Sequence, residues 1–467
     1  MMFHPATIAG RLNRLPMTRR HKVATFVIGF ALFFEFFDVN LSGVLGTVLT
    51  DQFHVSNAVQ PLLLGSAFLG MFFGALIINT LSDRIGRKKA FFLNLLIYSV
   101  FTLLGAFSPN ITFLIVCRFL AGVGVGSQPA LCDVYLSEIL PSKNRGRVIA
   151  WAYTIQVCAV PVEGFLARWL VPLHPGMAGW RWLFILGALG AFCAWILQKN
   201  LPESPRWLEA VGRHEEAEKN VKLFEEGIDE TSEVIADDNL IVIREKLPIS
   251  TLFKREFAKR TTMLYVFHIL QSIGYYGFGT LVPIVLAAKG YTVTHSLEYT
   301  AISFIGYPIG SLISLPIIER VERKWLIVGA AFCMALFGIL FGMSTSSATI
   351  MLCGFLYTLV SNVFSNAYHV FQAEIFPTSI RATATGSAYS LSRLMSGLMP
   401  FILLPILKQD GATAMFCIVA VVMVIIMLNI GLLGPKTTGV AMERVNESQL
   451  TESPRIRQET YESMHTS

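Results

Sequence analysis

The chain has 467 residues, of which 54% are hydrophobic and only 15% charged, whereas a soluble domain carries about 25% charged residues. With a mean hydropathy of +0.58, this composition excludes a disordered chain, a secreted disulfide scaffold and an ordinary cytosolic enzyme, and it indicates a polytopic membrane protein. The net charge of +6 does not indicate nucleic-acid binding, because the basic residues form short clusters between apolar segments, where they set orientation in a bilayer.

Twelve apolar segments are long enough to cross a membrane, which takes roughly 20 helical residues. They are predicted at residues 23–50, 60–82, 90–107, 111–140, 146–171, 180–200, 262–289, 297–320, 325–343, 348–376, 382–408 and 411–434. Of the 37 Lys and Arg residues, 31 lie in or beside one alternate set of connections and 4 in the other, with Arg118 and Arg393 inside spans. By the positive-inside rule, both termini are expected in the cytoplasm.

Four regions follow from this pattern. We expect an N-terminal six-helix bundle with a basic cytoplasmic N-terminus at residues 1–200 and a second six-helix bundle at residues 261–434. A cytoplasmic central loop at residues 201–260 separates them and contains a charged helical run. The tail at residues 435–467 is rich in Glu, Ser and Thr, and it is predicted to be disordered in the cytoplasm.

The two bundles are related by a duplication at one offset, 236 residues, which is the separation of Gly70 from Gly306. The nine like residues that align at this offset are Gly70 with Gly306, Gly74 with Gly310, Asp83 with Glu319, Arg84 with Arg320, Arg87 with Arg323, Lys88 with Lys324, Glu138 with Glu374, Pro141 with Pro377 and Arg145 with Arg381. Six spans is an even number, so the copies are parallel repeats, and a substrate is expected near the midplane between them. The glycines themselves favour close helix packing.

Five segments carry a family resemblance. The loop at residues 79–89 resembles the Gly-x-x-x-Asp-Arg-x-Gly-Arg-Arg/Lys signature of the major facilitator superfamily, with Asn79 in place of the first Gly. Further matches lie at residues 118–126, 138–146, 202–208 and 374–381. The last two are similar to segments of the sugar-porter and synaptic-vesicle-protein-like branches, which include bacterial niacin and aromatic-acid transporters. The resemblance implies an alternating-access carrier.

Acids and arginines gather at the cytoplasmic ends of the spans. Carboxylates and guanidiniums of adjacent helices can form charge-assisted hydrogen bonds there and hold the two halves together; the alternative is that the basic residues only set topology. By the resemblance, these residues form an intracellular gate that stabilises the outward-open state without touching substrate. The gate residues are Asp83, Arg84, Arg87, Glu138, Arg145, Glu203, Arg206, Glu319, Arg320, Glu374 and Arg381.

Glu35 and Asp38 lie three residues apart in span 1 and therefore on one helical face. Two adjacent carboxylates cannot both ionise cheaply, so one of them is predicted to carry a proton. The pair resembles the Asp-Gly-x-Asp motif of aromatic-acid:proton symporters, with Glu35 in place of the first Asp. In sugar porters, the corresponding Asp pairs with the Arg of span 4, which is Arg118 here. Helix rise puts Asp38 and Arg118 about 7.5 Å apart in depth, within reach of a guanidinium. The alternative is a static ion pair.

Arg393 in span 11 is the second buried cation and has no acid in its own helix. A guanidinium binds a carboxylate bidentately, so Arg393 is predicted to hold an anionic substrate. Its context resembles the arginine-containing span 11 of organic-anion carriers. The alternative is an acidic partner such as Glu163 or Asp133, and these acids could also carry protons. His268 and His369 are expected to be satisfied core histidines.

Span 7 distinguishes between substrates. Sugar porters carry Gln-Gln-x-x-Gly-x-Asn there, whereas residues 270–276 read Leu-Gln-Ser-Ile-Gly-Tyr-Tyr and lack the first Gln and the Asn. Tyr276 in the Asn position offers a stacking face, which favours a small planar substrate. The candidate substrate-binding residues are Arg393, Gln156, Gln271, Tyr275, Tyr276 and Tyr368.

The sequence thus predicts an all-α, twelve-span carrier in two parallel six-helix repeats, not an enzyme, that imports an aromatic or heterocyclic monocarboxylate with a proton. We expect a monomer in a bacterial inner membrane whose partners are substrate, proton and lipid. Seven cysteines lie singly in apolar segments, so no metal and no cofactor are expected. A sugar or polyol:proton symporter is the first alternative. A membrane enzyme or receptor is a remote one, because the sequence has no HExxH motif or sizeable soluble domain.

Overall fold

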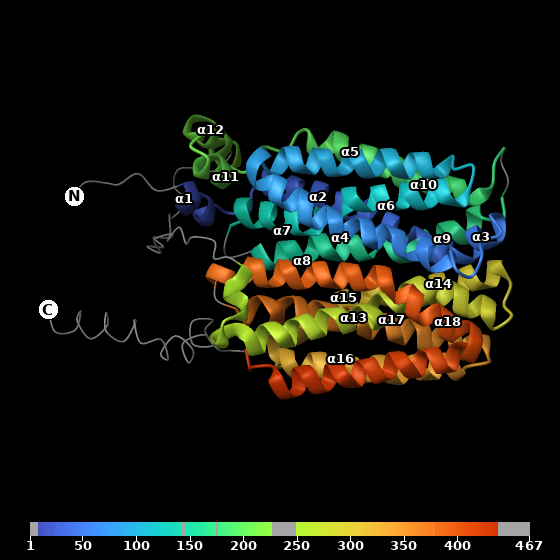
Figure 1. The fold of residues 1–467 in the computed structure, drawn as a ribbon. Coiled ribbons are helices and arrows are strands. Elements are labelled where there is room, and N and C mark those ends of the chain that lie inside the picture. The colour runs from blue at the N-terminus through green and yellow to red at the C-terminus, as the bar shows by residue number, and fades with distance from the viewer. Residues whose placement is uncertain (1–7, 142–144, 174–175, 227–248, 377, 438–467) are drawn as a thin grey trace, which may run out of the picture.

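A computed structural model describes residues 8–141, 145–173, 176–226, 249–376 and 378–437 (Figure 1). Within these ranges the regular structure is helical. The helices of the first half are α1 (Ile8–Arg14), α2 (Arg19–Val44), α3 (Gly46–Gln52), α4 (Gln60–Ile85), α5 (Arg87–Ala106), α6 (Ile111–Val125), α7 (Gln128–Ile139), α8 (Arg145–Val157), α9 (Ala159–Leu170) and α10 (Gly179–Gln198). The predicted disorder of the tail falls outside the described residues, apart from residues 435–437.

The connection between the halves holds α11 (Pro205–Ala210), α12 (His214–Glu225) and the short 3-10 helix η1 (Ile249–Phe253). The helices of the second half are α13 (Arg255–Ala288), α14 (Val293–Phe304), α15 (Gly306–Arg320), α16 (Arg323–Met343), α17 (Ser347–Glu374) and α18 (Thr378–Leu433). The charged run predicted to be helical in the central loop is therefore α12.

Eleven segments of the described chain are long and apolar enough to span a membrane. The last, Thr383–Leu433, has 51 residues and contains Gly411, whose φ of 86° breaks the helix. Glycine tolerates this conformation because it has no Cβ. The segment therefore forms spans 11 and 12, and the predicted all-α, twelve-span fold is confirmed.

Four spans predicted as single helices are each two helices. In spans 4, 5 and 8, the first helix ends at Val125, Val157 and Phe304 respectively. Each of these residues lies four positions before a proline, at 129, 161 and 308. A proline ring clashes with the carbonyl group four residues earlier, which explains the three breaks. Span 1 is interrupted without a proline, at Leu45 between α2 and α3.

The two halves lie side by side, with α2 to α10 in one and α13 to α18 in the other (Figure 1). Helices α1, α11 and α12 gather at one end, which we call the terminal end. Helix α3 and the beginning of α14 lie at the opposite end, which we call the far end.

The predicted duplication is visible in helix packing. A Cβ on Gly70 of α4 would overlap the carbonyl oxygen of Phe119 on α6, and a Cβ on Gly306 of α15 would overlap that of Phe355 on α17. The partners Phe119 and Phe355 are themselves 236 residues apart. The next pair repeats the relationship, with Gly74 against Val123 and Gly310 against Leu359. The glycines therefore serve close packing, as expected.

The halves are packed tightly toward the far end. The closest backbone approaches across the interface are Gly65 to Gly397, Gly43 to Thr280 and Gly164 to Ala301. A Cβ on Gly43 would lie 2.8 Å from the Cα of Thr280, and one on Gly164 would lie 2.9 Å from the Cα of Ala301. No side chain larger than hydrogen fits at these contacts without movement, so the far end is closed.

Nearer the terminal end, the interface carries exposed polar side chains. Asp133 on α7 and His369 on α17 are both exposed although they lie within spans. Tyr153 on α8 stacks on His369 across the interface, with ring centroids 6.3 Å apart, and donates a hydrogen bond to Asp133. Asp133 and His369 are therefore accessible to solvent at this part of the interface.

Candidate functional site

Asp38 and Arg118 form a buried ion pair in the first half, between α2 and α6. The Nη1 of Arg118 donates to Asp38 Oδ1 at 2.8 Å, and both side chains are 1% exposed. Arg118 also donates to the backbone carbonyl of Asp38 and to Ser42, while Thr102 donates to Asp38 Oδ1 at 2.7 Å. These charge-assisted bonds hold α2 and α6 together at this point.

Glu35 is also buried but is poorly hydrogen-bonded. Its Oε2 accepts from Gln156 on α8 at 3.3 Å, while its Oε1 has no hydrogen-bond partner within the described ranges. Glu35 is 0% exposed, and Arg393 of the other half lies within electrostatic range of it. Glu35 therefore links the two halves electrostatically.

Arg393 lies on α18 between two tyrosines. Its Nη1 donates to the hydroxyl of Tyr276 at 2.8 Å, and its Nη2 donates to the hydroxyl of Tyr389. The guanidinium also lies over both rings, 5.2 Å from the centroid of Tyr276 and 4.6 Å from that of Tyr389. Arg393 is only 2% exposed, and its Nε has no partner among the described residues. The group thus keeps a donor for a ligand.

The two acids considered as partners of Arg393 lie elsewhere. Asp133 accepts a hydrogen bond from Tyr153 at 2.9 Å. Glu163 on α9 is within electrostatic range of Arg118 and Asp38 instead. The acid that faces Arg393 is Glu35.

The other predicted binding residues surround Arg393 to different degrees. Gln271 on α13 donates to Ser392, the residue before Arg393, at 2.8 Å. Tyr275 packs edge-on against Tyr276. Tyr368 on α17 stands further away, stacked on His369 and edge-on to His268. Gln156 belongs to the first half, where it contacts Glu35.

The two histidines share a glutamine partner in the second half. The Nε2 of His268 is hydrogen-bonded to Gln372 at 2.8 Å, and Gln372 is hydrogen-bonded to the Nδ1 of His369 at 3.2 Å. His268 is a buried, partnered residue as expected, whereas His369 is exposed to the space between the halves.

Two ion pairs of the predicted gate follow the duplication. Arg87 contacts Glu138 at 3.3 Å in the first half, and Arg323 contacts Glu374 at 3.4 Å in the second. Both pairs join residues of one half, whereas the sequence suggested contacts between the halves. The structure is closed at the far end, and the gate residues lie at the opposite, terminal end. The gate therefore stays a prediction, because these pairs do not join the halves in this structure.

The remaining gate residues bind locally. Arg145 and Arg381 donate to the carbonyl oxygens of Leu140 and Phe376, again 236 residues apart. Arg206 donates to Asn13 on α1. Arg84 and Arg320 are exposed. The side chains of Asp83 and Glu319 lie outside what the structure describes.

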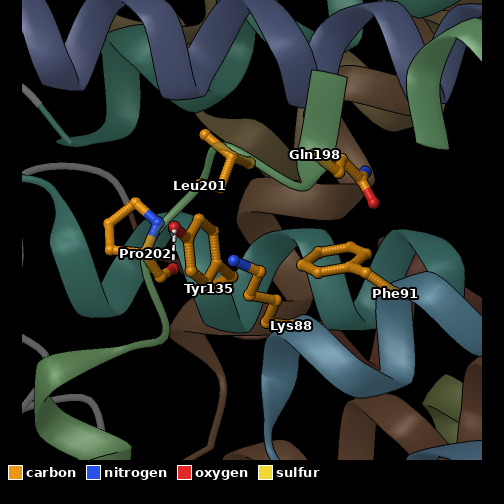
Figure 2. A pocket seen from close by; sticks show the side chains of 6 residues that line it. All are labelled: Lys88, Phe91, Tyr135, Gln198, Leu201 and Pro202. Carbon is orange, nitrogen blue, oxygen red and sulfur yellow. Dashed lines mark hydrogen bonds between the residues drawn. The ribbon is translucent and has the colours of Figure 1, made fainter. Parts of the chain in front are cut away.

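Glu203 anchors the segment that follows span 6. Its carboxylate accepts the backbone N–H groups of Arg87 and Lys88 at the beginning of α5, at 3.0 and 3.1 Å. Burial raises the pKa of the Glu203 carboxyl, and the backbone hydrogen bonds partly offset this effect. Figure 2 shows the adjacent pocket, where Tyr135 donates to the carbonyl oxygen of Pro202 at 2.8 Å. The residues that line this pocket come from the first half and from the beginning of the connection that follows it.

Sequence reasoning missed Tyr389 and Thr102. Tyr389 lies four residues before Arg393, so helical spacing alone could have placed it beside the guanidinium. Thr102 carries no such signal, because its contact with Asp38 joins α5 to α2.

Comparison with known proteins gives consistent matches along the whole chain. The family described as sugar (and other) transporter matches residues 22–448. The putative metabolite transport protein YyaJ of Bacillus subtilis is 32% identical over 395 residues, covering 84% of this chain and 87% of YyaJ. The niacin transporter NiaP of Acinetobacter baylyi is 27% identical over 441 residues, covering 94% of this chain and 99% of NiaP.

Among solved structures, the partially occluded inward open conformation of the xylose transporter XylE from E. coli superposes with a TM-score of 0.72. It covers 91% of this chain and 100% of its own, at 18% identity. At this identity the likeness concerns the fold.

Proposed function

The chain belongs to the sugar (and other) transporter family of the major facilitator superfamily, and we propose that it imports a small organic anion, an aromatic or heterocyclic monocarboxylate, together with a proton. The family consists of membrane transporters rather than enzymes. The observation that carries the proposal is the buried Arg393 between Tyr276 and Tyr389, beside the opposite half. A guanidinium binds the carboxylate, and a tyrosine ring stacks on a planar substrate.

Proton coupling would follow from competition for Arg393. A substrate carboxylate on Arg393 would remove the countercharge of Glu35, a buried acid with one unpartnered oxygen. An uncompensated buried carboxylate is costly, so Glu35 would take a proton as the substrate binds. One anion and one proton would thus enter the site together.

The Asp38–Arg118 pair would respond to that proton. Asp38 and Glu35 share a face of α2, so neutralising Glu35 removes a like charge beside Asp38. This change would alter the balance between the two conformations of the carrier. Because Asp38 accepts from both Arg118 and Thr102, we assign the proton to Glu35 and the charged role to Asp38.

Two features support transport across a bacterial inner membrane with both termini in the cytoplasm. The terminal end carries the excess of Lys and Arg, which favours the cytoplasmic side. The named relatives are bacterial, and the relative NiaP is named a niacin transporter. In this orientation, the structure is open toward the cytoplasm and closed toward the outside.

The test is uptake into proteoliposomes with an imposed pH gradient, inside alkaline. We expect labelled nicotinate or benzoate to accumulate and labelled xylose not to. Accumulation of xylose alone would support the second candidate, a sugar or polyol:proton symporter, which the fold of XylE and the segment at residues 202–208 favour.

A further inference from the structure

Glu163 is a buried carboxyl group that the proposed mechanism does not use. Its side chain on α9 is 0% exposed, and neither oxygen has a hydrogen-bond partner among the described residues. Burying a carboxylate without donors is very unfavourable, so the group holds a proton in this arrangement. Even the neutral carboxyl group has no hydrogen-bond partner here, and leaving a buried polar group unpaired is unfavourable. A different arrangement of the helices could supply partners or water to Glu163.

The charged groups around α9 are mostly committed to other partners. On α10, Arg181 donates to the carbonyl oxygens of residues 106 and 108. On α14, Glu298 is paired with His295 and with Arg168 of α9 itself. The remaining groups, Asp38 on α2 and Arg118 on α6, are the ones within electrostatic range of Glu163.

The position of Glu163 connects it to the movement of the far end. The next residue, Gly164, meets Ala301 of α14 at one of the closest contacts between the halves. When the far end opens, α9 separates from α14 and water reaches this part of α9. Glu163 can then ionise, and it must be protonated again before the far end closes over it.

Glu163 also lies on a line of acids that leads to the central site. Gln156, which contacts Glu35, is seven residues earlier in span 5, so Glu163 lies about 10 Å nearer the far end. Asp38 is one turn nearer the far end than Glu35 on α2 and faces both acids electrostatically. Glu163, Asp38 and Glu35 therefore lie in this order from the far end toward the central site.

We propose that Glu163 takes up the proton from the far side and that its protonation is required for the far end to close. In the open state, a proton from water binds the Glu163 carboxylate and passes by way of a transiently protonated Asp38 to Glu35. Glu163 then takes a second proton from the far side, which it keeps while the far end is closed, so one proton enters the site in each cycle. The inference rests on the proposed proton coupling, and it adds the residue at which the proton enters.

A labelling experiment tests the closing step without any substrate. Leu297 on α14 is 0% exposed and lies one helical turn before Ala301, which meets Gly164 of α9. Leu297→Cys therefore places a thiol on the face of α14 that separates from α9 when the far end opens. A membrane-impermeant maleimide is applied from the far side, with the protein lacking this substitution as the background. At about pH 8, we expect Glu163→Gln to slow labelling at least about fivefold, because glutamine mimics the protonated acid. At about pH 5.5 the two proteins should be labelled equally. Equal rates at both pH values would overturn the proposal.

A transport experiment separates the coupling role from a structural one. Glu163→Gln should lose accumulation driven by a pH gradient while retaining exchange of labelled for unlabelled substrate. Asp410→Asn, which removes an exposed acid, is the matched control and should retain both. Full accumulation by Glu163→Gln would refute the role.

If Glu163→Gln fails to reach the membrane, Glu163→Asp carries the test, because it keeps an ionisable group. Its labelling should remain faster at about pH 8 than at about pH 5.5, once each rate is divided by that of the unfolded protein at the same pH; loss of that pH dependence would overturn the proposal. If the labelling results hold but neither nicotinate nor benzoate accumulates, the proposed substrate is wrong and the role of Glu163 stands.

Discussion

Arg118 donates two hydrogen bonds to Asp38, one to the carboxylate at 2.8 Å and one to the backbone carbonyl. The pair is buried within the first half, and each of the two side chains is 1% exposed. A buried pair of this kind is destabilised far more by the loss of one member than by replacement of both.

Replacing Asp38 alone should therefore destabilise the fold. We expect Asp38→Ala to reduce the free energy of unfolding by about 3–5 kcal/mol, since Arg118 would be left as an uncompensated buried charge. Thermal unfolding in detergent measures the effect. The double variant Asp38→Asn with Arg118→Gln should lose less than either single change to Ala. A double variant that loses the sum of the single effects would contradict the coupling.

Closing of the far end should depend on Gly65. Its Cβ position is occupied by the carbonyl oxygen of Gly397, so Gly65→Ala prevents the observed approach of α4 to α18. We expect the far end to open, which far-side maleimide labelling of the Leu297→Cys background would detect as a faster rate. Gly329→Ala is the control, because no atom lies within 4 Å of the added methyl group. It should leave labelling unchanged, and a helix-interior Gly→Ala change should stabilise by about 0.5–1 kcal/mol.

Affinity for an anion should depend on the shape of the cation at position 393. Arg393→Lys keeps the charge but removes the planar fork of donors, so we expect the KM for uptake to rise about tenfold, or about 1.4 kcal/mol. Tyr389→Phe removes one hydroxyl partner of Arg393 and should have a smaller effect. Arg213→Lys, at an exposed residue before α12, is the control and should not change KM. An unchanged KM in Arg393→Lys would remove its role in binding.

The contribution of Glu203 to the stability of the fold should depend on pH. Its pKa is raised in the folded protein, so the folded state binds more protons than the unfolded one between the two pKa values. The stabilisation from this group is complete below the unfolded pKa of about 4.3 and is lost as pH rises through the folded value. We therefore expect the Tm advantage of wild type over Glu203→Gln to shrink with rising pH across this window. Glu209→Gln on α11 serves as the comparison, and a constant difference in Tm would contradict the assignment.

The sequence was most informative where the determinants are local or repeated. Apolar segments located the twelve spans, and the glycines at 70 and 306 indicated the duplication and its close packing. The breaks in spans 4, 5 and 8 were missed, although each follows from a proline four residues later.

Contacts between spans that are distant in the sequence could not be predicted as well. The cytoplasmic gate stays a prediction, and the two ion pairs that its residues form, Arg87 with Glu138 and Arg323 with Glu374, each lie within one half. The attraction between Glu35 and Arg393 joins opposite halves and therefore depends on how the bundles meet. No periodicity within one helix encodes that arrangement.

Substitutions of Glu35 and Asp38, the two acids of α2, should have different effects in transport assays. Glu35 has one unpartnered oxygen and faces Arg393, whereas Asp38 accepts from Arg118 and Thr102. Glu35→Gln fixes the neutral form, so substrate binding no longer requires a proton. We expect this variant to lose accumulation driven by a pH gradient. Combined with Glu163→Gln, which fixes the far-side acid as neutral too, it should exchange labelled for unlabelled anion at a rate that does not change between about pH 5.5 and pH 8. Asp38→Asn should instead impair exchange as well, because Arg118 loses its carboxylate partner. Proteoliposome exchange and accumulation, measured on the same preparations, distinguish the two. If exchange by the double variant Glu35→Gln with Glu163→Gln still depends on pH, the coupling proton binds another group.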